Sequence, residues 1–189
     1  MRIVLIGPPG AGKGTQASLM EARYHIIHLS TGEILRREIQ RRTTLGNQAK
    51  VYIDKGQLVP DKLLLELMEQ RLQQPDCDNG YLLDGFPRTI PQAVGLNTIL
   101  SHLNTTLDMV ISLSANEDEL VNRLVLRGKN SGRSDDTPDV IRDRQKVYWT
   151  QTAPLLEFYR EQGILREVDG QGTIDNVFQR IVEIMDTLC

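Results

Sequence analysis

Cysteine, aromatic residues and an excess of basic charge are all scarce in this chain of 189 residues. Its two cysteines, Cys77 and Cys189, match no metal-binding or redox spacing, so we expect reduced thiols and a cytoplasmic protein. Lys and Arg number 22 against 25 Asp and Glu, which gives a net charge of −3 and leaves no global basic field to hold nucleic acid. A site for anionic ligands must therefore be locally basic.

Long hydrophobic runs are also missing. The N-terminal apolar run, residues 3–6, ends at Gly7-Pro8 and is too short for a signal peptide or a membrane span, so we expect no membrane partner. A chain of this length can bury roughly 70% of its unfolded surface, which predicts a single domain with a real core. Because each predicted apolar helix face can pack inward against the core, we expect a monomer.

A glycine-rich turn over residues 7–15, Gly-Pro-Pro-Gly-Ala-Gly-Lys-Gly-Thr, is the most informative stretch. It follows an apolar run typical of a buried strand and precedes residues 16–22, which are typical of a helix. Strand, glycine-rich turn and helix together predict a phosphate-binding loop, in which backbone N–H groups, the helix dipole and Lys13 hold a polyphosphate. Gly14 follows the lysine where GTPases carry Ser or Thr, and Thr15 comes one residue later.

Apolar runs alternate with helical patterns along the rest of the chain. This predicts an α/β fold with a five-stranded parallel sheet covered by helices on both faces. The strands are expected at residues 3–6, 26–29, 81–83, 107–113 and 164–168. Pro154 should kink or split the long helix that starts at Thr137-Pro138. The polar residues 128–136 lack apolar periodicity and are expected to form an irregular excursion.

Acidic and histidine side chains offer fewer signals. Asp84 follows the third predicted strand, at the edge of the sheet where α/β proteins bind ligands, so it is a candidate partner for Mg²⁺ through water. An acid that caps a turn is the alternative. Ser30 and Thr31 open a helix, and for one of them capping alone is the expected role. The histidines, at positions 25, 28 and 102, form no pattern and are expected to be structural.

Four stretches, taken in order, resemble the adenylate kinases within the nucleoside monophosphate kinase family. They are the glycine-rich turn, S-T-G-E-I-L-R at 30–36, L-L-D-G-F-P-R-T-I-P-Q-A at 82–93 and the spacing from Arg133 to Arg144. The resemblance covers nearly the whole chain. It implies a P-loop fold, a small helical AMP-binding excursion over residues 30–59 and a short lid over residues 127–136. No cysteine cluster exists there, which excludes a zinc-stapled lid.

The resemblance implies transfer of the terminal phosphoryl group of ATP, bound with Mg²⁺, to AMP, which gives two ADP. The residues implied in catalysis are Lys13, Arg88, Arg123, Arg133 and Arg144. Those implied in ATP binding are Gly10, Ala11, Gly12, Lys13, Gly14, Thr15, Arg127 and Gly172. Those implied in AMP binding are Thr31, Arg36, Gln57, Leu58, Val59, Gly85, Phe86, Pro87, Arg88, Gln92, Arg133 and Arg144.

Some roles within these sets are more specific. Arg127 is expected to stack on the adenine of ATP, and Gln92 to read the base of AMP because its amide can donate and accept at once. Guanidinium groups suit phosphates because each offers two donors. The acceptor is already a phosphate anion, so no strong general base is expected. The lid is expected to close as phosphates draw in Arg127 and Arg133.

Two other functions stay open from the sequence alone. A uridylate–cytidylate kinase would share most of these motifs, although Thr31 and Gln92 favour adenine. A non-catalytic ATP-binding switch protein would use the phosphate-binding loop but would leave the set of arginines unexplained.

Overall fold

The computed structural model describes residues 1–131, 135 and 137–188 of the chain. Within this range one sheet contains five parallel strands, in the spatial order β2-β3-β1-β4-β5. The strands are β1 (Arg2–Ile6), β2 (Ile27–Ser30), β3 (Tyr81–Asp84), β4 (Met109–Ser114) and β5 (Leu165–Asp169). The predicted parallel α/β architecture is therefore confirmed.

The centre of the sheet is β1, which pairs with β3 on one side and β4 on the other. From β1 the chain continues to β2 at one edge, and after β3 it crosses to β4 on the other side of β1. The two halves of the sheet thus diverge at the carboxyl end of β1. Ligands of open α/β sheets bind at such a point, and the glycine-rich turn begins there.

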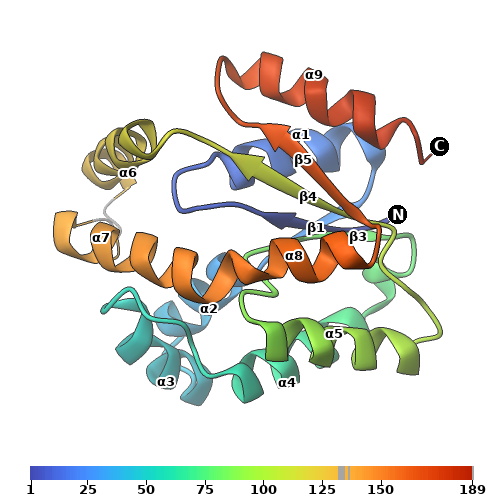
Figure 1. Ribbon diagram of the computed structural model, residues 1–189. Coiled ribbons are helices and arrows are strands. Elements are labelled where there is room, and N and C mark those ends of the chain that lie inside the picture. The colour runs from blue at the N-terminus through green and yellow to red at the C-terminus, as the bar shows by residue number, and fades with distance from the viewer. Residues whose placement is uncertain (132–134, 136, 189) are drawn as a thin grey trace.

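The helices within the described range cover both faces of the sheet (Figure 1). They are α1 (Lys13–Tyr24), α2 (Thr31–Gln40), α3 (Thr44–Ile53), α4 (Asp61–Leu72), α5 (Ile90–His102), α6 (Glu117–Ser131), α7 (Pro138–Val147), α8 (Pro154–Glu161) and α9 (Ile174–Met185), with the short 3-10 helix η1 (Pro75–Cys77) and the π-helical turn η3 (Tyr148–Thr152). No helix in this part of the chain is long and apolar enough to cross a bilayer.

Alternation along β1 divides the core into two layers. Ile3 and Leu5 pack in a cluster with buried residues of α1 and α9, which lie above the sheet in Figure 1. Val4 and Ile6 point to the opposite face and pack in a cluster with residues of α4, α5 and α8. Successive side chains of a strand face opposite ways, so a strand buried on both faces must be apolar throughout, as β1 is.

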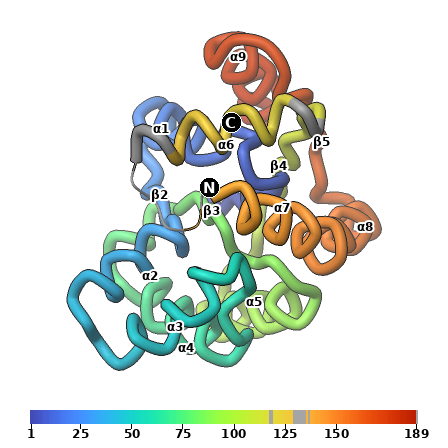
Figure 2. The backbone as a smooth tube through the Cα atoms, turned by 90° about the vertical axis from the view of Figure 1, so that its left-hand side faces the viewer, coloured from blue at the N-terminus to red at the C-terminus, as the bar shows by residue number. Residues whose placement is uncertain are grey.

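The segment between β2 and β3 is helical and projects to one side. Figure 2 shows α2, α3 and α4 grouped on the side of the molecule away from α9. Ser30 caps α2 by accepting a hydrogen bond from the backbone N–H of Glu33 at 3.4 Å. Capping therefore accounts for Ser30, and Thr31 is left to contact the edge of the sheet.

Two expectations about helix ends have different outcomes. The prediction that Pro154 kinks or splits a long helix is confirmed in that the α-helical pattern is interrupted: α7 ends at Val147, α8 begins at Pro154, and the π-helical turn η3 continues the helical path between them. The prediction of an irregular excursion from Gly128 is wrong for its first four residues, since α6 continues to Ser131. A helix that has already formed extends through polar residues at little cost. Of the remainder of that stretch, residues 132–136, the structure describes Asp135 and not the others.

Candidate active site

The glycine-rich turn joins β1 to α1 as predicted. Gly12 is the N-cap of α1 and has φ 85°. Gly10 has φ 91°, and a β-carbon there would lie 2.7 Å from the carbonyl oxygen of Leu120 on α6. Only glycine fits such a position. The loop therefore presents backbone groups and the N-terminus of α1 at the divergence point of the sheet.

Lys13 begins α1 and turns back over the loop. Its ammonium group donates to the carbonyl oxygens of Gly7 at 2.7 Å and Pro8 at 3.1 Å. Burial lowers the pKa of Lys13 to about 8, against the attraction of Asp84. Three guanidinium groups lower the pKa further, those of Arg88, Arg144 and Arg127. Several segments of the chain thus bring positive charge to one place.

A cleft opens beside Lys13, with about 980 Å³ of empty space including its mouth. It lies among the ends of β1 and β3 and helices α2, α3 and α7. The residues predicted for the acceptor that line it are Thr31, Arg36, Gln57, Leu58, Val59, Gly85, Pro87, Arg88 and Arg144. Phe86 does not line the cleft: its side chain is fully buried in the core beneath the turn.

Two of the guanidinium groups that line the cleft, those of Arg88 and Arg144, are held in place by oxygen acceptors. Arg88 Nε donates to the carbonyl oxygen of Gly85 at 2.7 Å. Arg144 Nη1 lies 2.8 Å from Asp135 Oδ2 and also donates to the backbone oxygen of Asp135 at 3.1 Å. Burial lowers the pKa of Arg88, and the charge of Arg144 lowers it further. An anion bound between these cations would relieve that repulsion, and a phosphate fits two guanidinium forks.

Asp84, at the end of β3, lies close to a histidine. His28 Nε2 on β2 lies 3.4 Å from Asp84 Oδ2, and both side chains are largely buried. Burial alone would raise the pKa of the Asp84 carboxyl, but the contact with His28 and the charge of Lys13 outweigh it and lower the pKa. Sequence reasoning missed His28, because no local pattern shows that the adjacent strands β2 and β3 bring it to Asp84.

The Asp84 carboxylate suits a divalent cation that is shared with phosphates. Asp84 Oδ2 lies 3.8 Å from the position of a β-carbon built on Gly14, which places the oxygen at the start of α1. Among the described residues, no group of three or more His, Cys, Asp and Glu side chains could hold a metal ion. One carboxylate plus phosphate oxygens is the usual environment of Mg²⁺.

Gln92 occupies a different position from the one expected of a base reader. Its Oε1 accepts a hydrogen bond from the backbone N–H of Arg88 at 2.7 Å, and its Nε2 donates to Asp61 Oδ1 at 2.7 Å. The side chain is fully buried and does not line the cleft. The structure thus shows Gln92 supporting the backbone of Arg88, and contact with a base stays a prediction.

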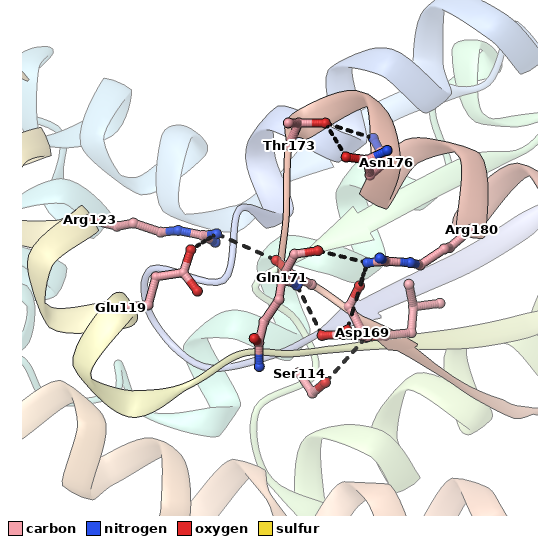
Figure 3. A network of polar contacts seen from close by, with 10 residues as sticks. Ser114, Glu119, Arg123, Asp169, Gln171, Thr173, Asn176 and Arg180 are labelled. Atoms are coloured by element: carbon pink, nitrogen blue, oxygen red, sulfur yellow. Dashed lines mark hydrogen bonds and ion pairs between the residues drawn. The ribbon is translucent and has the colours of Figure 1, made fainter.

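Arg123 and Arg127, one turn apart on α6, lie at different parts of the site. Arg123 Nη2 contacts Glu119 and lies 3.5 Å from the carbonyl oxygen of Gly170, in the turn after β5 (Figure 3). Arg127 acts electrostatically on Lys13. Arg123 thus lies against the turn after β5, and its predicted part in catalysis stays a prediction.

The turn after β5 lies beside the glycine-rich loop. Gly170 N–H donates to the carbonyl oxygen of Ser114 at 2.8 Å, and a β-carbon on Gly170 would lie 3.7 Å from the carbonyl oxygen of Ala11. Arg180 on α9 donates to the carbonyl oxygens of Asp169 and Gln171, each at 2.7 Å (Figure 3). Gly172, predicted to contact ATP, belongs to this turn. Arg133, predicted for both substrates, lies outside the described residues.

Comparison with known proteins places this arrangement in a family. The family model for adenylate kinase matches residues 5–164. An adenylate kinase of Cyanothece sp. (strain PCC 7425 / ATCC 29141) is 48% identical over 187 residues, which are 99% of this chain and 96% of the relative. Adenylate kinases of Mycobacterium bovis (strain BCG / Pasteur 1173P2) and Stenotrophomonas maltophilia (strain K279a) are 48% and 47% identical, over 98% and 96% of this chain and 99% and 97% of the relatives.

Proposed function

This chain belongs to the adenylate kinase family and is an enzyme that transfers the terminal phosphoryl group of ATP to AMP; on that premise we propose which residues carry the reaction. The observation that supports the proposal is the convergence of Lys13, Arg88 and Arg144 on one cleft at the carboxyl edge of the sheet. A uridylate–cytidylate kinase and a non-catalytic switch protein are not favoured, since the relatives are adenylate kinases.

AMP occupies the cleft in this proposal. Arg36, Arg88 and Arg144 bind its phosphate, because their side chains line one cavity with Lys13. Residues 57–59 line the same cavity from the segment between α3 and α4 and contact the nucleoside, largely through backbone. Residues 30–59 thus act as the AMP-binding excursion. Thr31 shapes the phosphate side, where its hydroxyl donates to the carbonyl oxygen of Gly85 at 2.8 Å.

ATP binds across the glycine-rich loop, with residues 10–15 around its phosphates. We assign Arg127 to the ATP phosphates and Arg123, with residues 170–172, to the adenine side. This reverses the assignment expected from the sequence. The support is that Arg127 acts on Lys13 whereas Arg123 lies against Gly170. A guanidinium plane at that turn suits stacking on a base.

Transfer then depends on position and charge. The attacking AMP oxygen is already ionised, so no residue has to remove a proton. Lys13 and the guanidinium groups of Arg88 and Arg144 stabilise the negative charge that spreads over the oxygens of the transferring group. Asp135 holds Arg144 in position, as does the carbonyl oxygen of Gly85 for Arg88. These acceptors fix the donors before substrate arrives, which avoids reorganisation during the reaction.

Asp84 would hold, through water, the Mg²⁺ that accompanies ATP. When bound, the ion neutralises charge on the β- and γ-phosphates. Asp84 suits this role because its pKa is lowered, which keeps the carboxylate ionised. The same ionised oxygen attracts Lys13, so the carboxylate and the ammonium group face the phosphates from neighbouring elements.

Residues 127–136 serve as a short lid in this proposal, and the chain acts as a monomer in the cytoplasm. The pair formed by Asp135 and Arg144 ties the end of the lid to α7 beside the cleft.

Burial raises the pKa of Cys77 to about 11, which makes it an unreactive thiol suited to a reducing compartment. Sedimentation at micromolar concentration tests the monomer, which a dimer mass would contradict.

One experiment tests the acceptor assignment. ADP formation is measured with ATP and Mg²⁺ in the presence of AMP, UMP or CMP in turn. We expect turnover with AMP and kcat/KM lower by about two orders of magnitude or more with either pyrimidine nucleotide. Equal use of UMP or CMP would contradict the AMP assignment. Tight ATP binding without turnover would favour a switch protein.

A further inference from the structure

The helical path that runs from α7 into α8 contains a π-helical turn, η3, beside the cleft. Between α7 and α8, the backbone N–H of Ala153 donates to the carbonyl oxygen of Tyr148, five residues earlier, at 2.9 Å. Pro154 follows directly. Proline lacks the N–H that an α-helix would use at this point, and its ring clashes with the carbonyl group four residues earlier. The wider turn accommodates that ring without ending the helical path.

This turn changes which side chains face the cleft. In an α-helix, residues four apart are rotated by about 40° past a full turn, so Arg144 and Thr152 would differ by about 80°. A π-helical turn holds an extra residue and takes back part of this rotation. In the structure Arg144, Tyr148 and Thr152 all line the cleft. Thr152 therefore stays on the side of the substrates although it lies two turns beyond Arg144.

Thr152 contacts the backbone of a central arginine. Its Oγ1 donates to the carbonyl oxygen of Arg88 at 2.9 Å, and the residue is only 7% exposed. The N–H of Arg88 is held by Gln92, as described above, and its Nε by Gly85. Arg88 is thus fixed at three points, and Thr152 supplies the one that comes from the π-helical turn between α7 and α8. A buried carbonyl group that loses its donor is costly to leave unpaired.

We propose that Thr152 is a positioning residue for phosphoryl transfer, which holds the carbonyl group of Arg88 so that the guanidinium group points at the transferring phosphate. The inference rests on the function proposed above for Arg88. It adds that the π-helical turn links Arg88 and Arg144, two of the arginines of the cleft, because the same helical path carries Arg144 in α7 and fixes Arg88 through Thr152. A displacement of catalytic groups by about 1 Å can slow such a reaction by about 100-fold.

The test removes the hydroxyl group and keeps the shape of the side chain. With saturating ATP and AMP, we expect Thr152→Val to lower kcat about tenfold, while KM for ATP stays within about twofold of the wild type. Thr150→Val is the matched control. Thr150 lies on the same turn, is exposed, and donates to the carbonyl oxygen of Lys146 within its own helix. We expect this control to leave kcat unchanged.

A second pair keeps the test decisive if valine disturbs packing. Thr152→Ser and Thr152→Ala both lack the methyl group and differ by one hydroxyl, so serine should retain nearly full kcat and alanine should lose it. Equal rates in these two variants, or a wild-type kcat in Thr152→Val, would overturn the proposal. Arg88→Lys distinguishes failure of the role proposed for Arg88 from failure of the role proposed for Thr152. A wild-type rate in that variant would refute the role of Arg88 itself, whereas a loss there with no effect at Thr152 refutes only the present proposal.

Discussion

The ammonium group of Lys13 donates to the carbonyl oxygen of Gly7, 2.7 Å away, across the loop that both residues belong to. In this position the ammonium group is hydrogen-bonded to a backbone carbonyl group of its own loop. A polyphosphate oxygen is a stronger acceptor than a carbonyl group, and we expect it to replace Gly7 when nucleotide binds. Lys13 is therefore already at the site, and a bound anion can replace the carbonyl group of Gly7 as its hydrogen-bond acceptor.

The pKa of Lys13 gives a pH dependence with a definite sign. Burial lowers this pKa to about 8, so the free enzyme loses the ammonium charge as pH rises through that value. We expect kcat/KM for ATP to fall about tenfold per pH unit above about pH 8. Bound phosphates favour the charged form, so kcat should hold to higher pH. A kcat/KM profile that is flat from pH 7 to pH 9.5 would contradict this account.

Replacement of Arg88 by lysine tests the geometry of its donors. The guanidinium group offers a planar fork, whereas lysine offers a point charge. We expect Arg88→Lys to lower kcat by about 10²–10³-fold at unchanged thermal stability. Arg160→Lys is the control, because Arg160 is exposed on α8 and pairs with Glu157 and Glu167 away from the cleft. Similar losses in both variants would show that the effect does not come from the site.

The exchanged roles of Arg123 and Arg127 can be separated by kinetics. Arg127→Met should lower kcat by about 10²-fold, because a charge near Lys13 is lost. Arg123→Met should raise KM for ATP and keep kcat within about threefold, because its guanidinium group lies at the turn proposed for the base. Steady-state kinetics with ATP varied at saturating AMP distinguishes the two. The opposite result would restore the assignment expected from the sequence.

Gly85 lies where two substrate-facing side chains approach the backbone. A β-carbon there would be 2.8 Å from both Thr31 Oγ1 and Arg88 Nη2, and the φ of 83° is strained for other residues. Gly85→Ala should raise KM for AMP about tenfold and lower the free energy of unfolding by about 1–3 kcal/mol.

Gly163 supplies the matched control for this prediction. It has a similar φ of 75°, but no atom lies within 4 Å of a β-carbon built on it. Gly163→Ala should therefore show the loss of stability without the change in KM for AMP. If the two variants have the same KM for AMP, crowding of Thr31 and Arg88 does not matter.

Local signals account for the parts of the fold that the sequence could predict. Apolar runs next to glycine-rich turns are sufficient to locate β1 and the phosphate-binding loop, and Asp84 follows from the end of β3. Pro154 marks a break in a helix because its ring acts on its own neighbours. The effect of proline on its neighbours does not show that the interruption takes the form of a π-helical turn, because that outcome depends on what the widened helix packs against.

Long-range packing decides the parts that the sequence could not predict. Arg123 and Arg127 share one face of α6, so spacing alone leaves open which of them reaches Lys13. Gln92 binds Asp61, 31 residues earlier in the chain, and His28 meets Asp84 from a neighbouring strand. No sequence pattern within one element carries these contacts.

The central claim is that cations from separate segments act on one chain of phosphates, and substitution of Lys13 tests it most directly. Lys13→Met keeps the length of the side chain and removes its charge. Measured as ADP formed from ATP and AMP near pH 7, kcat/KM should fall by about 10³-fold or more in a protein that is still folded by circular dichroism. A folded variant with a rate near that of the wild type would contradict the account.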